Sequence, residues 1–346
     1  MMGSQSIKFI HLLVLFFALV GLGIYGVGCG PHGGGGGNAY DAPLGIAVDA
    51  SGNIWVANNN SNTVTELNMT GTTIGTYTVG LEPAGIAIDS SGNVWVANDA
   101  NTETTVTELS STGSLIGTYK AGASPVGIAI DKLGNVWVTN GGSNTITELS
   151  STGSSIGTYG VGISPTAIAI DNTGNAWVAN VGSNTITELS PMGSTIGTYS
   201  VGQFPIGIAI DASDNVWVAT AGTATITKLN STGSTIGTYT VGIAPFGIVI
   251  DKLGNIWVAN DCGNDPHCNN NGTVTELSST GAYLNTYDVG KTPYGIAIDA
   301  SGNVLVTNSG SNNITKLAGV TTGPQYFPCS YFTDTTCPQF QGGGNF

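Results

Sequence analysis

Apolar and polar residues follow a pattern that returns about every 40 residues between Pro43 and Leu317. Each return contains four segments of strand length. The segments "GIAID" and "NVWVAN" are almost continuously apolar, whereas "NTITEL" and "TIGTYTVG" alternate and are rich in β-branched residues. Turn sequences of the types "DxxGN" and "SSTGS" join the first segment to the second and the third to the fourth. The pattern predicts four antiparallel strands in each repeat, and no stretch between them has helical periodicity.

The motif "PxGIAID" opens each repeat, and its prolines are Pro43, Pro83, Pro125, Pro165, Pro205, Pro245 and Pro293. A four-stranded unit that is apolar on both faces cannot bury itself alone, so it must stack on neighbouring units. Closing the stack into a ring removes its two open ends. We therefore predict an all-β fold, a seven-bladed β-propeller with four antiparallel strands per blade. No "IGTY" segment follows Lys316, so we expect residues near 320–328 to give blade seven only a poor outer strand.

Aromatic residues keep one register in the second strand of the repeats, and Leu305 takes the seventh place. The tryptophans in this register are Trp55, Trp95, Trp137, Trp177, Trp217 and Trp257. A large aromatic at a fixed position predicts packing between blades, and a ring of exposed stacking platforms is the alternative.

The succession "PxGIAID", "GNVWVAN", "NTITEL" resembles the NHL-repeat propeller family, and "GNVWVTN" with "TITELS" resembles the streptogramin-lyase propellers. The resemblance extends from residue 43 to about residue 317 and implies the propeller fold. An NHL-type propeller implies recognition of a ligand or a protein. The streptogramin-lyase resemblance implies a metal-assisted elimination that opens a cyclic peptide lactone. That family uses a histidine base, acidic groups and magnesium in the channel.

The N-terminal residues have the pattern of an export signal, because Lys8 precedes an apolar run over residues 9–27 that ends in small residues. The residues before Cys29 resemble a bacterial lipobox, which implies that Cys29 is lipidated; an uncleaved signal anchor is the alternative. We predict a signal peptide at 1–28, a glycine-rich tether at 29–42, the propeller at 43–317 and a tail at 318–346. The expected product is an exported, membrane-anchored lipoprotein, periplasmic or on the cell surface.

Composition excludes two classes of protein. The chain has a net charge of −14 and no arginine, so it lacks the basic surface that nucleic-acid binding requires. Hydrophobic residues make up 40% and charged residues 8%, which is unlike a disordered chain. We expect a monomer whose partner is an envelope protein or a small ligand.

The loops that join successive blades, and those that join second to third strands, vary most and carry both insertions, "NDANTETT" and "DCGNDPHCNNNG". Variable loops on a rigid scaffold are typical of a binding surface, so we place it on this face, at the mouth of the central channel. The candidate binding residues are Glu82, Asp99, Phe246, Asp261, His267 and Tyr294. Phe246 and Tyr294 follow their blade prolines directly, and this column either packs the channel entrance or forms an aromatic ligand shelf.

Polar residues that recur in every blade are expected to serve the architecture. Aspartates ending the first strands suit turn hydrogen bonds, with a calcium ring as the alternative, and asparagines ending the second strands suit loop entry. Glutamates of "TEL" are replaced by Lys228 and Lys316 in two blades, which favours charge pairs on the rim. No motif requires a cofactor, although the loop acids Glu82, Asp99, Glu103, Asp261 and Asp265 could hold Ca²⁺ or Mg²⁺ with loop carbonyls.

An exported chain with an even number of cysteines beyond Cys29 is expected to form disulfides. We predict local pairs, Cys262 with Cys268 and Cys329 with Cys337, and a link between the insertion and the tail is the alternative. A zinc site that uses His267 with the insertion cysteines matches no familiar spacing.

Histidines are absent from the repeat strands, because the three of the chain are His11, His32 and His267. A general base near neutral pH would then have to be a carboxylate with a raised pKa or a lysine. We therefore predict a non-enzymatic propeller that binds a ligand or protein, and we assign no catalytic residue. The alternative is a metal-dependent lyase or lactonase of the streptogramin-lyase or gluconolactonase type.

Overall fold

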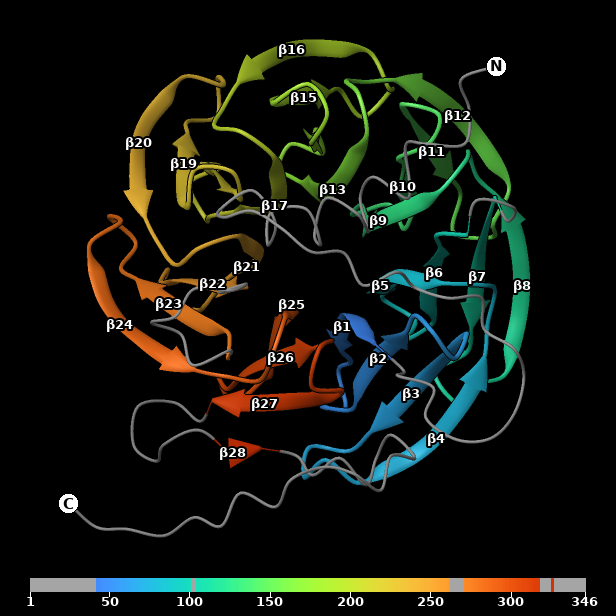
Figure 1. Cartoon of the computed structure of the whole chain (residues 1–346). Helices are drawn as coiled ribbons and strands as arrows, with labels where there is room; N and C mark the ends of the chain where they lie inside the picture. The colour runs from blue at the N-terminus through green and yellow to red at the C-terminus, as the bar shows by residue number, and fades with distance from the viewer. Residues whose placement is uncertain (1–41, 101–103, 262–270, 318–324, 327–346) are drawn as a thin grey trace, which may run out of the picture.

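Seven antiparallel sheets follow one another around a closed ring (Figure 1). The computed structural model describes residues 42–100, 104–261, 271–317 and 325–326. Strand order within every sheet is the order along the chain, so each blade is a simple meander. The predicted seven-bladed propeller is confirmed. Within the described ranges, the chain has no helix long and apolar enough to cross a membrane.

The first two strands of each blade form its inner half. The innermost strands are β1 (Pro43–Val48), β5 (Pro83–Ile88), β9 (Pro125–Ile130), β13 (Pro165–Ile170), β17 (Pro205–Ile210), β21 (Pro245–Ile250) and β25 (Pro293–Ile298). The second strands are β2 (Ile54–Asn58), β6 (Val94–Asn98), β10 (Val136–Asn140), β14 (Ala176–Asn180), β18 (Val216–Thr220), β22 (Ile256–Asn260) and β26 (Val304–Asn308). Every second strand is buried along its whole length, which explains its uninterrupted apolar sequence.

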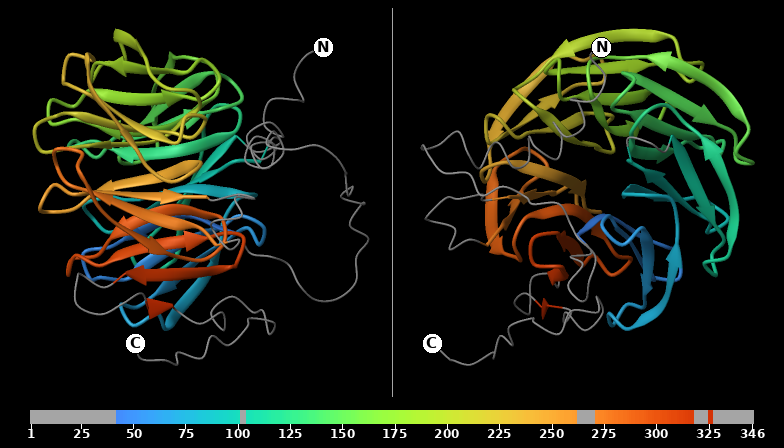
Figure 2. Two further views of the ribbon diagram at one scale, coloured as in Figure 1. Left: turned by 60° about the vertical axis from the view of Figure 1, so that its left-hand side comes forward. Right: turned by 45° about the vertical axis from the view of Figure 1, so that its right-hand side comes forward.

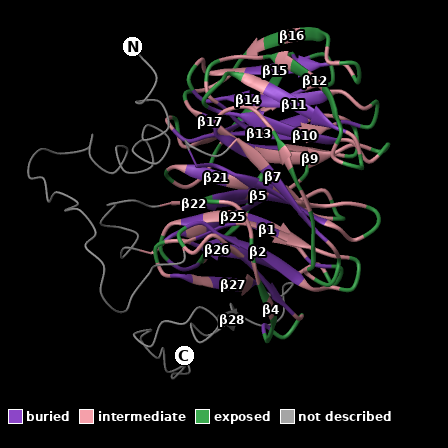
Figure 3. Ribbon diagram, turned by 90° about the vertical axis from the view of Figure 1, so that its right-hand side faces the viewer, coloured by how far each residue is buried: buried purple, intermediate pink, exposed green. Residues whose placement is uncertain are grey.

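The third and fourth strands form the outer half. The third strands are β3 (Thr63–Leu67), β7 (Thr105–Leu109), β11 (Thr145–Leu149), β15 (Thr185–Leu189), β19 (Thr225–Leu229), β23 (Thr273–Leu277) and β27 (Asn313–Leu317). The outer strands are β4 (Thr73–Thr78), β8 (Leu115–Lys120), β12 (Ser155–Gly160), β16 (Thr195–Ser200), β20 (Thr235–Thr240), β24 (Tyr283–Asp288) and β28 (Gln325–Tyr326). Figure 2 shows the ring from two further sides. Figure 3 is coloured by burial, and outer strands such as β16 contain exposed residues.

Hydrophobic clusters fill the spaces between neighbouring blades. Trp95, which is fully buried, packs with Val136 and Leu149 of the next blade, and the other tryptophans make equivalent contacts. Each tryptophan also stacks on the tyrosine of its own outer strand, with ring centroids 5.4–5.7 Å apart. The predicted role of this register as inter-blade core is confirmed, and the alternative of exposed platforms is wrong.

Blade seven closes the ring against blade one. Leu305 packs in one cluster with Ile54 and Leu67 of blade one, in the place that tryptophan holds elsewhere. The Thr307 hydroxyl donates a hydrogen bond to the Leu44 carbonyl at 2.7 Å across the same junction. The outer strand of this blade is the two-residue β28, which pairs with Thr315 and Lys316 of β27. The expected poor outer strand of blade seven is confirmed.

Three groups of predictions fall outside the described residues. The N-terminal signal with Cys29 lies within residues 1–41, and the insertion with Cys262, His267 and Cys268 lies within 262–270. The tail cysteines, Cys329 and Cys337, lie within 327–346. The signal, the lipidation and both disulfide pairs therefore stay predictions.

Candidate functional site

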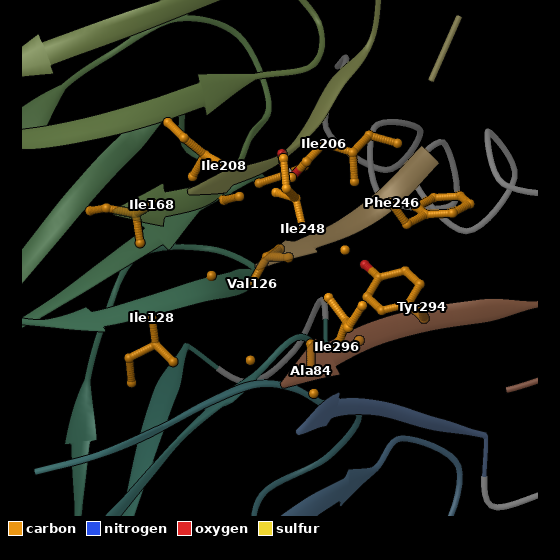
Figure 4. A pocket seen from close by; sticks show the side chains of 18 of the residues that line it. Ala84, Val126, Ile128, Ile168, Ile206, Ile208, Phe246, Ile248, Tyr294 and Ile296 are labelled. Atoms are coloured by element: carbon orange, nitrogen blue, oxygen red, sulfur yellow. The ribbon is translucent and has the colours of Figure 1, made fainter. Parts of the chain in front are cut away.

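A cavity of about 220 Å³ lies at the centre of the ring, where the seven innermost strands meet (Figure 4). Its walls come from the residues that follow the prolines. Two sets of residues line it. One is the isoleucines three positions after each proline, such as Ile128, Ile208 and Ile248, and the other is the residues that directly follow the prolines. Among the described residues that line the cavity, only Thr166 and Tyr294 have a polar side-chain atom, so this lining is almost entirely apolar.

Glycine between those two columns allows the innermost strands to lie close together. A Cβ atom on Gly85 would overlap the carbonyl oxygen of Val126 in the next blade, and one on Gly45 would overlap that of Ala84. The same backbone approach occurs at Gly127, Gly207, Gly247 and Gly295. The narrowness of the ring therefore favours glycine at this position of "PxGIAID", and blade four, with Ala167, is the exception.

Two large aromatic residues meet at the channel mouth, on the face that carries the variable loops. Phe246 of blade six and Tyr294 of blade seven stack with ring centroids 5.3 Å apart and an interplanar angle of 26° (Figure 4). Phe246 is buried and Tyr294 is half-buried. In each blade the strand pairing is irregular just after the proline, and such bulges change the direction of side chains. The prediction that this column packs the channel entrance is confirmed, because its residues line the channel. The aromatic ligand shelf stays a prediction.

Asp99 is the most perturbed acid of this face. It follows β6, and its backbone N–H donates to the Glu82 carbonyl at 2.9 Å. Its side chain is 4% exposed, and within the described part of the chain its Oδ1 has no hydrogen-bond partner. Burial, and secondly the charge of Glu82, raises the pKa of the Asp99 carboxyl to about 8. A buried carboxyl with an unsatisfied oxygen and a raised pKa is a common feature of functional sites.

The charge of Asp99 acts on Tyr294, which belongs to a blade two places away. Burial raises the pKa of the Tyr294 hydroxyl to about 12, and the charge of Asp99 contributes to the rise. Of the six predicted residues, Phe246 and Tyr294 are in contact. Asp99 lies on the same face, where its N–H bonds the loop before β5, but it is not among the residues that line the cavity.

The remaining candidates lie further out. Glu82 is exposed, and its backbone has a positive φ of 53° and donates to the Asn62 Oδ1 at 2.9 Å. Asp261 is half-buried, and its N–H donates to the Ala244 carbonyl at 3.0 Å. This backbone bond is equivalent to that of Asp99, so the two aspartates hold the same position in blades six and two. His267 lies outside the described residues.

The recurring aspartates lie on the opposite face, among the "DxxGN" turns. Asp49 Oδ1 accepts the backbone N–H groups of Ser51 and Asn53 at 2.9 and 2.8 Å, and its Oδ2 accepts Trp55 Nε1 at 3.1 Å. The aspartate–tryptophan bond recurs at 3.0–3.3 Å in the six blades that have tryptophan. The predicted turn role of the aspartates is confirmed. Among the described residues they form no group of three or more that could hold a metal ion.

The prediction that the "TEL" glutamates form charge pairs on the rim is wrong. These glutamates are only 2–7% exposed, and each accepts a hydrogen bond from an outer-strand tyrosine at 2.7–2.9 Å. Burial raises the pKa of each, although the tyrosine hydroxyl works against the rise. The lysines in the same slot pair with the turn aspartates instead, Lys228 with Asp211 at 3.5 Å and Lys316 with Asp299 at 3.3 Å.

The asparagines that end the second strands serve the blades, as predicted. Asn140 Nδ2 donates to Thr145 and Thr147 hydroxyls of its own blade, and its Oδ1 accepts the Gly122 N–H of the loop from the preceding blade. Equivalent threonine bonds are made by Asn58 and Asn98.

The described side chains of the mouth form no donor set that fits magnesium. Mg²⁺ requires near-octahedral oxygen coordination, usually through carboxylates. Among the described residues no group of three or more histidine, cysteine, aspartate or glutamate side chains could hold a metal ion. The channel itself adds only the hydroxyls of Thr166 and Tyr294, and Thr166 Oγ1 lies 3.4 Å from the Pro205 and Ile206 carbonyls.

Two further polar residues lie in the column of Asp99 and are not among the predicted site residues. Asn59 is 2% exposed, and its Nδ2 donates to the Pro83 carbonyl of the next blade at 3.4 Å. Ser309 donates to the Thr292 carbonyl through both its N–H and its hydroxyl. Aligning the residue after each second-strand asparagine, instead of searching for acids alone, would have found them.

Solved structures of streptogramin B and virginiamycin B lyases share the fold of this chain. A streptogramin B lyase structure is 19% identical with a TM-score of 0.69, covering 78% of this chain and 91% of that one. Selenomethionine-substituted virginiamycin B lyase from Staphylococcus aureus is 18% identical with a TM-score of 0.67, covering 79% and 93%. A catalytically inactive histidine-to-alanine variant of the Staphylococcus aureus enzyme, with quinupristin, is 19% identical with a TM-score of 0.66, covering 77% and 92%. At these identities the likeness shows the fold alone.

No curated protein matches the sequence. A sequence model of the virginiamycin B lyase family, in contrast, matches residues 37–229, which is more than half of the chain. The matched part contains the first four blades and most of the fifth. With its seven-bladed structure, this match shows that the chain belongs to the virginiamycin B lyase family.

Proposed function

We propose that this propeller is a non-enzymatic binding module that takes an apolar or aromatic group of its ligand at the channel mouth. The observation that carries the proposal is the stacked pair of Phe246 and Tyr294 beside an apolar channel. Aromatic side chains contribute large contact area and a rigid surface, and they are frequent at ligand sites.

The size of the channel limits what can enter. Drug-sized ligands usually occupy pockets of about 300–1,000 Å³. The channel, at about 220 Å³, is smaller. It would accept one side chain or ring of a larger ligand, and the rest of that ligand would lie across the variable loops. A protein that presents an apolar side chain, or a cyclic peptide, meets this requirement.

Lyase activity is the second candidate, and family membership together with Asp99 favours it. The family resemblance implies a histidine base and magnesium, but the repeat strands contain no histidine. The carboxylates of the mouth that the structure describes do not fit the metal. Asp99 is the described group suited to act as a base near neutral pH, because its pKa is about 8. A metal-independent elimination would therefore depend on Asp99.

Quinupristin separates the two candidates, because the lyase relative was determined with it. The full-length protein is incubated with quinupristin, with and without Mg²⁺, and the mixture is analysed by reversed-phase chromatography. Ring opening by elimination leaves the mass unchanged, so retention time is the readout. We expect no conversion. Turnover by the parent protein that is lost in Asp99→Asn would establish the enzyme instead.

Binding is tested with the same compound by calorimetry. We expect Phe246→Leu and Tyr294→Leu to weaken any binding of quinupristin, and Tyr283→Leu, at an exposed tyrosine of β24, to leave it unchanged. Equal binding by the mouth variants and the control would refute the proposed site.

We also propose that the N-terminal segment holds the propeller at a membrane. This rests on the apolar run before Cys29 and on the resemblance of that run to a lipobox. Fractionation of cells that express Cys29→Ala tests it. We expect the variant to move from the membrane to the soluble fraction, whereas retention in the membrane would favour an uncleaved anchor.

A further inference from the structure

Departures from the repeat are concentrated on one side of the channel mouth. The residue after the second strand is apolar or glycine in blades three to five, where it is Gly141, Val181 and Ala221. In blades six, seven, one and two it is polar. The large aromatics of the post-proline column also lie in blades six and seven. We name this side the polar arc, and its members are Asn59, Asp99, Phe246, Asp261, Tyr294 and Ser309.

Asp99 is the member of the polar arc that has a buried side-chain oxygen without a hydrogen-bond partner among the described residues. At the same position in blade one, the Asn59 amide can donate to the Pro83 carbonyl. An ionised carboxylate in the same place cannot donate to a carbonyl, and Asp99 Oδ1 is buried without a partner among the described residues. An unsatisfied buried oxygen is destabilising, so a donor that reaches it from a ligand would be bound favourably.

The surroundings of Asp99 favour a cationic donor over a neutral one. Glu82 and Asp261 add negative charge to the same face, and within the described mouth-face loops Lys291 is the single basic residue. The whole chain carries −14, so its long-range field attracts cations. The aromatic faces of Phe246 and Tyr294 are compatible with a positive charge, because their quadrupoles attract it.

We propose that the polar arc binds an organic ammonium ion, with the ammonium group hydrogen-bonded to Asp99 and its apolar group against the Phe246–Tyr294 pair. This inference rests on the proposed binding function and specifies its ligand class. An amphipathic amine or a basic side chain of a peptide supplies both groups. Such a ligand replaces the missing partner of Asp99 and places apolar surface at the channel entrance.

Proton release is a consequence of the proposal. In the free protein the Asp99 carboxyl is largely protonated at neutral pH, because burial and secondly Glu82 raise its pKa to about 8. An ammonium ligand favours the ionised form, so binding expels the proton into solvent. The charged groups that act on Asp99 in this process are Glu82, from the loop before β5, and Tyr294, from β25.

Three small aromatic probes of similar size and different charge test the proposal. They are phenethylammonium, 3-phenylpropionate and 2-phenylethanol, each titrated into the full-length protein at pH 8.5 and followed by calorimetry. A charge-assisted hydrogen bond predicts that phenethylammonium binds at least about tenfold more tightly than the other two. Its affinity should increase from pH 6 to pH 9 as Asp99 loses its proton.

Asp99→Asn should abolish the preference for the ammonium probe and the pH dependence of its binding. The matched control is Asp288→Asn, which removes the same charge from an exposed position on the outer strand β24. Circular dichroism of both variants checks that they fold. An unchanged preference in Asp99→Asn, or equal binding of the three probes to the parent, refutes the ammonium site.

The outcomes separate this proposal from the proposed function. Equal binding of all three probes that is lost in Tyr294→Leu would leave the apolar site standing and refute its charge selectivity. Absence of binding by every probe, together with no binding of quinupristin, would refute both.

Discussion

The face with the "DxxGN" turns (the turn face) and the face with the variable loops and the channel mouth (the mouth face) are built from the same repeated sequence. Their polar residues nevertheless have different roles. On the turn face, Asp131 accepts two backbone amides and Trp137 Nε1, and its partners recur in most blades. On the mouth face, Asp99 occurs in one blade and has an oxygen without a partner among the described residues. The repeated turn aspartates support the architecture through their hydrogen bonds. The repeated strand-ending asparagines also support it through Nδ2, although five of them leave a buried Oδ1 without a partner among the described residues. Polar residues specific to one blade, with incomplete bonding, are the candidates for function.

The largest loss of stability is expected from removing the tryptophan that packs between blades and donates to a turn aspartate. Trp137→Ala removes a fully buried ring from the cluster between blades three and four and leaves Asp131 Oδ2 without its indole donor. Large-to-small core substitutions of this kind cost about 3–5 kcal/mol. Urea unfolding measures the loss. The mouth-face counterpart is Phe246→Leu, a substitution of similar volume that should cost less than about 1.5 kcal/mol. An equal loss for both would contradict the division between the faces.

The inner glycines give the next largest effect. Gly85→Ala places a methyl group against the Val126 carbonyl, which belongs to the backbone and cannot rotate away. Overpacking predicts a loss of about 1–3 kcal/mol in the free energy of unfolding. The control is Gly160→Ala on the outer strand β12, where an added Cβ meets nothing within 4 Å. This control should be neutral or stabilising by up to about 1 kcal/mol. Blade four has Ala167 at the equivalent inner position. If Gly85→Ala left the free energy of unfolding unchanged, the innermost strands of other blades could also shift to accommodate alanine, as that of blade four does.

Most of the fold could be predicted from the sequence, because each strand has its own periodicity and each turn its own aspartate, glycine or serine. The packing of the tryptophan register followed from the same repetition. The role of Glu66 and its equivalents could not be predicted. Because two blades have lysine at the same position, the sequence suggested that this position is exposed to solvent. In the structure, Lys228 lies over Trp217 and pairs with Asp211.

The candidate site was predicted only in part. The adjacency of Phe246 and Tyr294 followed from blade order. The interaction of Asp99 with Tyr294 did not, because blade one separates their blades and the sequence does not give side-chain directions. A signal for the burial of Asp99 was present, since its column contains Val181 and Ala221, which are buried.

Titration of Asp99 is expected to change the free energy of unfolding by a smaller amount. The dependence of this change on pH differs between the two faces. Its pKa in the folded protein, about 8, lies above the ordinary value of 3.8. The protonated form is therefore favoured by folding, and this stabilisation is complete below pH 4 and is lost as pH rises through 8. Asp99→Asn keeps the neutral shape without the titration. We expect parent and variant to unfold at similar urea concentrations at pH 5, and the variant to be more stable by at least about 1 kcal/mol at pH 9.

The turn-face aspartates have the opposite dependence. Burial works to raise the pKa of Asp211, but hydrogen bonds from Asn215 and Trp217 outweigh it and hold the pKa below its ordinary value. The stabilisation from Asp211 is present above pH 4 and is lost as pH falls through its lowered pKa. A parent protein whose stability increased steadily from pH 5 to pH 9 would contradict the assignment of Asp99.

The smallest effect is expected where the repeat already varies on the turn face. Lys228→Glu restores in blade five the glutamate that other blades bond to an outer-strand tyrosine, here Tyr239, which already stacks on Trp217. The substitution removes the ion pair of Lys228 with Asp211 and its contact with the indole ring, 4.3 Å from the ring centroid. It offers in exchange hydrogen bonds from Tyr239 and Asn215, as Glu188 receives from Tyr199 and Asn175.

Because an isolated ion pair contributes about 0–1 kcal/mol, we expect a net change within about 1 kcal/mol at pH 5. The change should turn unfavourable as pH rises, because the new glutamate lies next to Asp211. A loss at pH 5 as large as that of Trp137→Ala would show that the lysine blades have their own architecture and are not substitutions within a common one.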